Sequence, residues 1–277
     1  PPANRFPPFF FIDTATTEIF TYSVVGCVRC VYETEFIPGG ANDPTPRALS
    51  NQEVKDLVEM WGQAARRANE CGFEVLEIHG AHGYCVHQFL SPQANLRNDE
   101  YGGSEENRMR FCLEVTESVR AHWPDDKPLF LRLSCEDRAG WDLDASIRLS
   151  KKVKPLGVDV IDCSGGGMQG SPTEFAPTYG YQVPYSDGIR READILTMAV
   201  GLIVHAEQSE EILQKGQADI IALAREILYN PNWPMDAARK LGAEDHLGTM
   251  PDQQAYWLGR REATATEVVP STYGKGW

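Results

Sequence analysis

The stretch FEVLEIHGAHGYCVHQFLSP, residues 73–92, decides the fold, because a short apolar strand runs directly into a loop of polar side chains. Residues 73–79 have the length and the apolar, partly branched composition of a buried strand. A helix predicted over residues 50–71 precedes this strand and stops at Gly72, the residue type that most often ends helices. A helix followed by a buried strand is the repeating element of an α/β protein.

The same alternation continues along the chain and sets the architecture. Short apolar strands that alternate with helices indicate a parallel sheet covered by helices. No GxGxxG motif follows the first strand, which argues against an open dinucleotide-binding sheet and favours a (β/α)₈ TIM barrel. The further strands are expected at 128–134, 158–164, 195–201 and 218–224, and the further helices at 104–122, 144–153, 185–193 and 207–215, with helical residues continuing to Leu241.

The length of the chain makes this barrel incomplete. A full barrel needs about 250 residues, and only five strand–helix units can be recognised, all within residues 44–242. Residues 1–43 form a divergent, irregular segment rich in proline and aromatic residues, with a strand or two expected between Ile19 and Phe36. Residues 243–277 form a C-terminal tail. We therefore expect the C-terminal five units of a barrel.

Composition excludes several classes of function. The formal net charge of -14 argues against nucleic acid and against anionic membranes, because both require a basic surface. No apolar run is long enough for a transmembrane helix, which needs about 20 residues. The seven scattered cysteines are typical of reduced thiols in a cytoplasmic protein. Cys27 and Cys30 lack the second ligand pair that a structural metal site needs.

Candidate catalytic residues follow the first predicted strand, where a barrel places its active site. His79, His82 and Tyr84 lie within six residues of one another (79–84). Two histidines at this spacing can bind a metal, donate hydrogen bonds or pack structurally. A metal site would need further ligands, and Asp162 is the one near candidate. A pair of N–H donors directed at a substrate carbonyl oxygen fits these residues better, because such donors stabilise developing negative charge.

Candidate binding residues follow the later strands. Arg132 lies in an otherwise apolar strand, which indicates either a structural ion pair or an anionic or electron-rich group at the barrel mouth. Glycine-rich strand ends let backbone N–H groups approach a phosphate, although a glycine run alone is often a plain loop. The candidate phosphate-binding residues are Ser164, Gly165, Gly201, Ala224 and Arg225.

These motifs together resemble one enzyme family. The segment EIHGAHGYCVHQFLSPQANLRNDEYGGSEENRMRF (77–111) closely resembles the hallmark segment of the Old Yellow Enzyme family. The resemblance covers about Pro44 to Leu241, and the paired histidines are similar to those of the thermophilic-like, NADPH dehydrogenase-type subgroup. The motifs PLFLRLS, GVDVIDCSGGG, GYQVPYSDGIR, AVGLI and ADIIALAREIL follow in the family's order.

The resemblance implies an FMN-dependent ene-reductase, in which NADPH or NADH reduces the flavin and the flavin passes hydride to an activated alkene such as an enone or enal. It implies that His79 and His82 bind the carbonyl oxygen and that Tyr84 protonates the α-carbon. It also places Arg132 beside flavin N1 and O2. The implied phosphate cradle consists of Ser164, Gly165, Gly201 and Arg225, with Ala224 contributing its backbone where the family has glycine.

Two alternatives remain at this point. The family carries three further strands and a flavin-binding glutamine that have no recognisable counterpart in residues 1–43. The chain could therefore be a truncated, non-catalytic barrel fragment that binds no flavin, and flavin content separates this alternative from the enzyme. A flavin-free metal hydrolase that uses His79 and His82 is the second alternative, and metal analysis tests it. Assembly into a homo-oligomer is left open.

Overall fold

The fold is built on a parallel sheet whose strands follow one another in chain order. The computed structural model describes residues 48–168 and 177–265. Its five-stranded sheet has the order β1-β2-β3-β4-β5, with every pair parallel. Chain order without reversal is the order of a barrel wall, whereas a doubly wound sheet reverses at a switch point. The strands are β1 (Leu76–Gly80), β2 (Leu129–Ser134), β3 (Val160–Ser164), β4 (Leu196–Ala199) and β5 (Ile220–Ile221).

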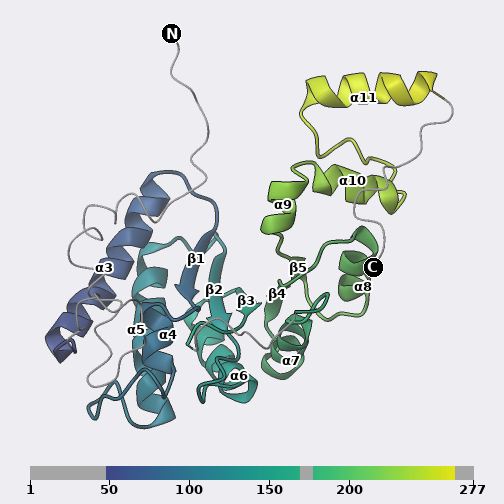
Figure 1. Ribbon diagram of the computed structural model, residues 1–277. Coiled ribbons are helices and arrows are strands. Elements are labelled where there is room, and N and C mark those ends of the chain that lie inside the picture. The colour runs from purple at the N-terminus through teal and green to yellow at the C-terminus, as the bar shows by residue number, and fades with distance from the viewer. Residues whose placement is uncertain (1–47, 169–176, 266–277) are drawn as a thin grey trace, which may run out of the picture.

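Helices connect the strands and line the outside of the curved sheet (Figure 1). The described residues therefore confirm the α/β barrel fold and contain five of its β/α units. The helices are α3 (Asn51–Glu70), α4 (Cys85–Leu90), α5 (Glu105–His122), α6 (Leu143–Val153), α7 (Val183–Ala193), α8 (Ala206–Gln214), α9 (Arg225–Tyr229), α10 (Trp233–Lys240) and α11 (Asp252–Thr264), with a short 3₁₀ turn η2 (Lys154–Leu156).

Helix starts follow side-chain capping. Helix α3 begins with a capping box, in which the Ser50 side chain accepts from the Glu53 N–H and the Ser50 N–H donates to Glu53 at 2.8 Å. The predicted start of α6 at Asp144 was wrong. Asp142 is the N-cap, because its side chain accepts from the Ala145 N–H at 2.8 Å, and Asp144 lies in the first turn.

Two helices were not predicted, and the strands are shorter than predicted, β5 most of all. Helix α4 lies in the segment that was expected to be a loop, and α11 lies in the predicted tail. Strand β5 was predicted over residues 218–224 but spans only Ile220–Ile221. The strand expected between Ile19 and Phe36, and the Cys27–Cys30 motif, lie outside the described residues.

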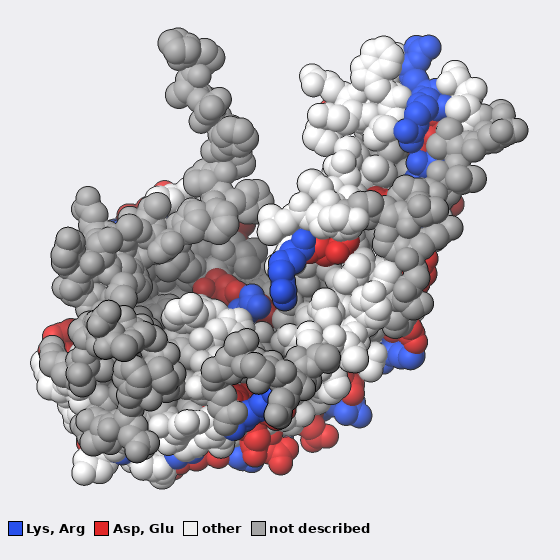
Figure 2. Space-filling model, viewed as in Figure 1, with Lys and Arg blue, Asp and Glu red and all other residues white. Residues whose placement is uncertain are grey.

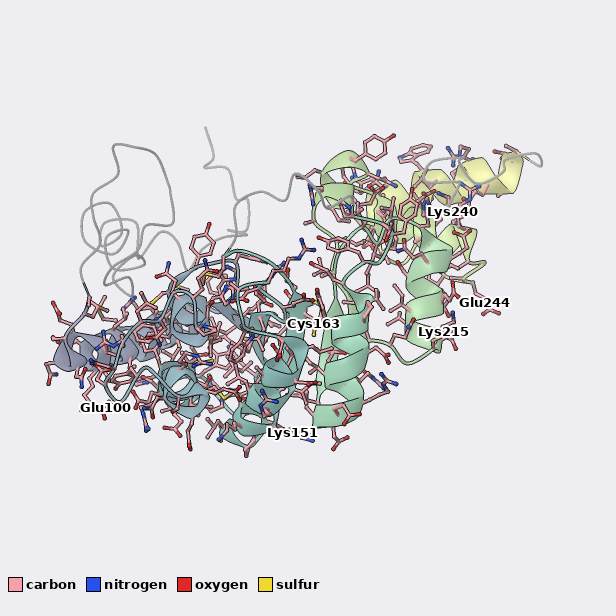
Figure 3. All side chains as sticks on the ribbon, turned by 60° about the horizontal axis from the view of Figure 1, so that its bottom comes forward. Glu100, Lys151, Cys163, Lys215, Lys240 and Glu244 are labelled. Atoms are coloured by element: carbon pink, nitrogen blue, oxygen red, sulfur yellow. The ribbon has the colours of Figure 1, made fainter. Side chains whose placement is uncertain are left out.

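The two faces of the sheet differ in what covers them. In β2, Leu129, Leu131 and Leu133 are fully buried, while the alternating Phe130 and Arg132 are half-buried. Alternate residues of a strand point to opposite faces. The leucine face packs against the helices as part of the main core, within which Cys163 lies at the middle of the molecule (Figure 3). The other face carries the half-buried side chains and forms the interior of the barrel.

Two further features concern the helices and the cysteines. None of the described helices is long and apolar enough to cross a membrane. In the described ranges the cysteines at 71, 85, 112, 135 and 163 are all free thiols.

Candidate active site

Three aromatic and imidazole rings meet at the carboxyl end of β1. His79 belongs to β1, and His82 and Tyr84 lie in the loop between β1 and α4. The His79 ring centroid is 5.2 Å from that of His82 and 5.4 Å from that of Tyr84. Tyr84 is 55% exposed. The structure therefore brings together the three residues predicted to be catalytic.

The main chain of His82 is held in an uncommon conformation. Its φ of 60° is left-handed, which costs a residue other than glycine about 1 kcal/mol or more. The His82 N–H donates to Ser134 Oγ at 2.9 Å, and Ser134 Oγ donates to the Gly166 carbonyl at 2.7 Å. One hydroxyl at the end of β2 therefore ties the loop after β1 to the loop after β3.

A second set of contacts fixes the next residue. The Gly83 N–H donates to Nδ1 of the buried His87 at 2.9 Å, and His87 Nε2 is 3.6 Å from Asp137 Oδ2. A side chain at Gly83 would place its Cβ 2.3 Å from the Gly167 carbonyl oxygen. Ser134, His87 and Asp137 hold this loop in place and were not predicted to do so.

Burial keeps the imidazoles of His79 and His82 neutral near pH 7. Desolvation, followed by the positive charge of Arg132, lowers the pKa of His79 to about 4. Desolvation, followed by Arg132 and His79, likewise lowers the pKa of His82 to about 4. Neutral imidazoles each carry one N–H, so near neutral pH both residues can act as hydrogen-bond donors without carrying charge.

A row of charged residues crosses the interior beside the histidines. His79 pairs with Arg132 in the sheet register, and Arg132 pairs with Asp162. Arg132 Nη1 lies 3.2 Å from Asp162 Oδ2, so the structural ion pair considered from the sequence is present. Arg132 Nε is buried and has no hydrogen-bond partner within the described ranges, so this guanidinium donor is unsatisfied.

Two carboxyl groups close to Arg132, those of Glu77 and Asp162, have raised pKa values. Burial, followed by the negative charge of Asp162, raises the pKa of Glu77 to about 7. Burial also raises the pKa of Asp162, although Arg132 opposes that shift. In Figure 2 acidic and basic side chains lie together in the hollow at the middle of the molecule. The interior thus holds one arginine and two carboxyl groups that do not both ionise readily.

The predicted phosphate-binding residues lie at the same end of the sheet. Ser164 ends β3 and Gly165 follows it. Gly201 follows β4 with a φ of 112°, a conformation that favours glycine. Ala224 precedes α9, of which Arg225 is the first residue, and both are exposed. Because Ala199 pairs with Ile221, the loops that carry Gly201 and Arg225 leave adjacent strands.

The described part of the chain contains no set of side chains that could bind a metal ion. No group of three or more His, Cys, Asp or Glu side chains there is arranged to hold a metal ion.

Comparison with known proteins identifies relatives over most of the chain. The model of the NADH:flavin oxidoreductase / NADH oxidase family matches residues 24–244. An NADPH dehydrogenase of Geobacillus sp. (strain WCH70) is 46% identical over 208 residues, which are 74% of this chain and 60% of the relative. The NADPH dehydrogenase of Bacillus subtilis (strain 168) is 46% identical over 202 residues, 72% of this chain and 59% of the relative. The chain thus spans about 60% of the length of these relatives.

Solved structures agree at the level of the fold. An Old Yellow Enzyme homologue from Zymomonas mobilis superposes with a TM-score of 0.61 at 27% identity, over 74% of this chain and 57% of that one. Morphinone reductase in complex with tetrahydroNAD superposes with a TM-score of 0.58 at 29% identity, over 76% of this chain and 56% of that one.

Proposed function

Because this chain belongs to the NADH:flavin oxidoreductase / NADH oxidase family, the Old Yellow Enzyme family, we propose that it is an FMN-dependent oxidoreductase. Its reductant would be NADPH or NADH, and its substrate an activated alkene of the enone or enal type. The observation that carries this proposal is the cluster of His79, His82 and Tyr84 at the carboxyl end of β1, with Arg132 on the neighbouring strand.

The residues present fit a flavin. The Arg132 side chain is 27% exposed, and its buried Nε has no partner among the described residues, which suits an electron-rich ring edge. Gly201 has the left-handed conformation that lets a backbone approach a phosphate closely. Arg225 is exposed at the next strand end. Ser164, Gly165 and Ala224 complete the proposed phosphate cradle, and a bound FMN would supply the hydride for the alkene.

The chain's own residues would polarise the substrate and supply a proton. The neutral His79 and His82 would each donate one N–H to the carbonyl oxygen, where negative charge grows as the alkene accepts hydride. Tyr84 would donate its phenolic proton to the α-carbon, because its exposed side chain lies beside the ring of His79. Low pKa values keep the imidazoles uncharged, so that they donate hydrogen bonds without giving up a second proton.

Flavin content and turnover of the purified chain test this proposal. We expect a visible flavin spectrum, near-stoichiometric FMN after denaturation, and consumption of NADPH or NADH that depends on an added enone such as cyclohexenone. A colourless protein that also takes up no added FMN would overturn the proposal and support the truncated, non-catalytic fragment. The free thiols of the described residues suit a reducing compartment, and we propose a cytoplasmic location on that ground.

A further inference from the structure

The imidazole of His82 makes one side-chain hydrogen bond, and this bond controls its chemistry. His82 Nε2 lies 2.7 Å from Ser164 Oγ at the end of β3. Nδ1, the other ring nitrogen, forms no hydrogen bond with any described residue. In a neutral imidazole the partner of one nitrogen decides which nitrogen keeps the proton. Ser164 therefore decides which tautomer His82 adopts.

The two tautomers have opposite consequences for a donor. If Ser164 donates its hydroxyl proton to Nε2, the only ring proton lies on Nδ1, which remains available to a ligand. If Nε2 donates to Ser164 instead, Nδ1 presents a lone pair. A lone pair would repel the carbonyl oxygen that the proposed function requires His82 to bind.

The surroundings of Ser164 favour the first arrangement. Ser164 is 4% exposed, so water does not compete for its hydroxyl proton. The other acceptor in reach is Oε1 of the buried Gln182, at 3.5 Å, the outer limit for a hydrogen bond. A hydroxyl has one proton, and the acceptor 0.8 Å closer to it is the imidazole nitrogen at 2.7 Å.

The main chain of His82 keeps the ring in this place. Ser134 accepts the His82 N–H, and its own hydroxyl proton is used on the Gly166 carbonyl. Ser134 thus fixes the position of His82 without touching its ring. Ser134 therefore binds the main chain of His82, and Ser164 binds its imidazole.

We propose that Ser164 is a positioning residue, which donates its hydroxyl proton to His82 Nε2 and so fixes the Nδ1–H tautomer. The consequence for catalysis rests on the proposed function, but the tautomer itself does not. Any contact between Ser164 and the flavin phosphate is then made by its backbone, because its hydroxyl proton is already used.

Nitrogen NMR of the full chain, labelled with ¹⁵N at histidine, tests this proposal. Two-bond couplings between the ring carbon protons and the ring nitrogens show which nitrogen is protonated, and the six histidines of the chain keep the spectrum simple. A His82→Gln variant assigns the signals of His82. At a pH well above 4 we expect an unprotonated Nε2 in the wild-type chain and a shift toward the Nε2–H form in Ser164→Ala.

Ser134→Ala is the matched control, because it also removes a hydroxyl from His82 but only from the main chain. Its His82 tautomer should remain that of the wild type, with folding checked by circular dichroism. A protonated Nε2 in the wild-type chain would overturn the proposal even if Ser164→Ala failed to fold, as would an unchanged tautomer in a folded Ser164→Ala. The spectrum requires no turnover, so a chain with the expected tautomer that reduces no alkene contradicts the proposed function alone.

Discussion

The first three β/α units and the last two differ sharply in how they are packed. All five residues of β3 are buried, and the main core joins β1 to β3 with α3 to α7. Beyond it lies a smaller cluster of Val183, Ala199, Ile203, Ile212 and Ala218. Strand β5 has two residues and neither is fully buried, and on α9 Leu228 is 83% exposed.

This difference separates the two tasks of the proposed site. The residues that would handle the alkene, at positions 79–84, stand on the densely packed units. Three of the proposed phosphate-binding residues, Gly201, Ala224 and Arg225, stand on the sparsely packed units. A ligand stabilises the state that binds it, so FMN binding should add most order to the second region.

The largest expected effect compares two aliphatic truncations. Leu131→Ala, at a fully buried position in β2, should lower the free energy of unfolding by about 4 kcal/mol, because the dense core cannot collapse around the cavity. Ile212→Ala in α8 should cost about 2 kcal/mol, because its cluster is small. Urea denaturation measures both, with the exposed Leu228→Ala as a control that changes little. Equal costs for the two truncations would contradict the contrast between the regions.

A substitution in the loop after β1 should cost nearly as much. Gly83→Ala combines a φ of 80° with a Cβ 2.3 Å from the Gly167 carbonyl oxygen, so we expect a loss of about 3 kcal/mol. Gly103→Ala is the matched control, because Gly103 has a φ of 77° but no atom within 4 Å of its added Cβ. It should lose only the strain, about 1 kcal/mol. Thermal unfolding distinguishes the two, and similar losses would mean that the close approach to Gly167 is unimportant.

The next effect concerns chemistry rather than stability. Tyr84→Phe should slow alkene reduction about a hundredfold, because it removes the proposed proton donor. Stability should hardly change, since Tyr84 is 55% exposed. Stopped-flow measurement of the two half-reactions should show flavin reduction by NADPH at the wild-type rate. Unchanged rates for both half-reactions would rule out Tyr84 as the donor.

The smallest effect depends on pH. The folded-state pKa of Glu77, about 7, lies above its ordinary value of 4.5, so folding favours its protonated form. This contribution is fully present below pH 4.5 and is lost as the pH rises through 7. Glu77→Gln should therefore unfold less readily than the wild type at pH 8, by up to about 2 kcal/mol, and equally at pH 4.5. His79 and His82 are present in both proteins, so their titration should not change the comparison. A difference in the free energy of unfolding that is constant with pH would exclude the raised pKa of Glu77.

Sequence patterns predicted what depends on neighbours along the chain. His79, His82 and Tyr84 could be grouped because a parallel strand delivers its last residues to one end of the sheet. The helix over 50–71 could be placed because its cap is local, formed by Ser50 and Glu53. The start of α6 was misjudged because Asp142 and Asp144 are equally good local caps, and only the structure shows which one accepts a bond.

Features that depend on distant partners could not be predicted. Ser134 meets His82 across 52 positions of sequence, so nothing near either residue signals the contact. Helix α11 was missed because it buries none of its residues and therefore shows no apolar face. Strand β5 was overestimated because apolar composition extends beyond the two residues that β4 can pair.

The close approach of Gly83 and Gly167 has a consequence for protein engineering. The loops that follow β1 and β3 are in contact through their main chains, and Ser134 forms a hydrogen bond with each of them. The conformation of one loop therefore depends on that of the other. If only the loop after β1 were replaced with that of a relative, the new loop would pack against a β3 loop whose conformation fits the original one. Exchanges intended to change substrate choice should therefore replace both loops together, with residues 134 and 166 taken from the same donor.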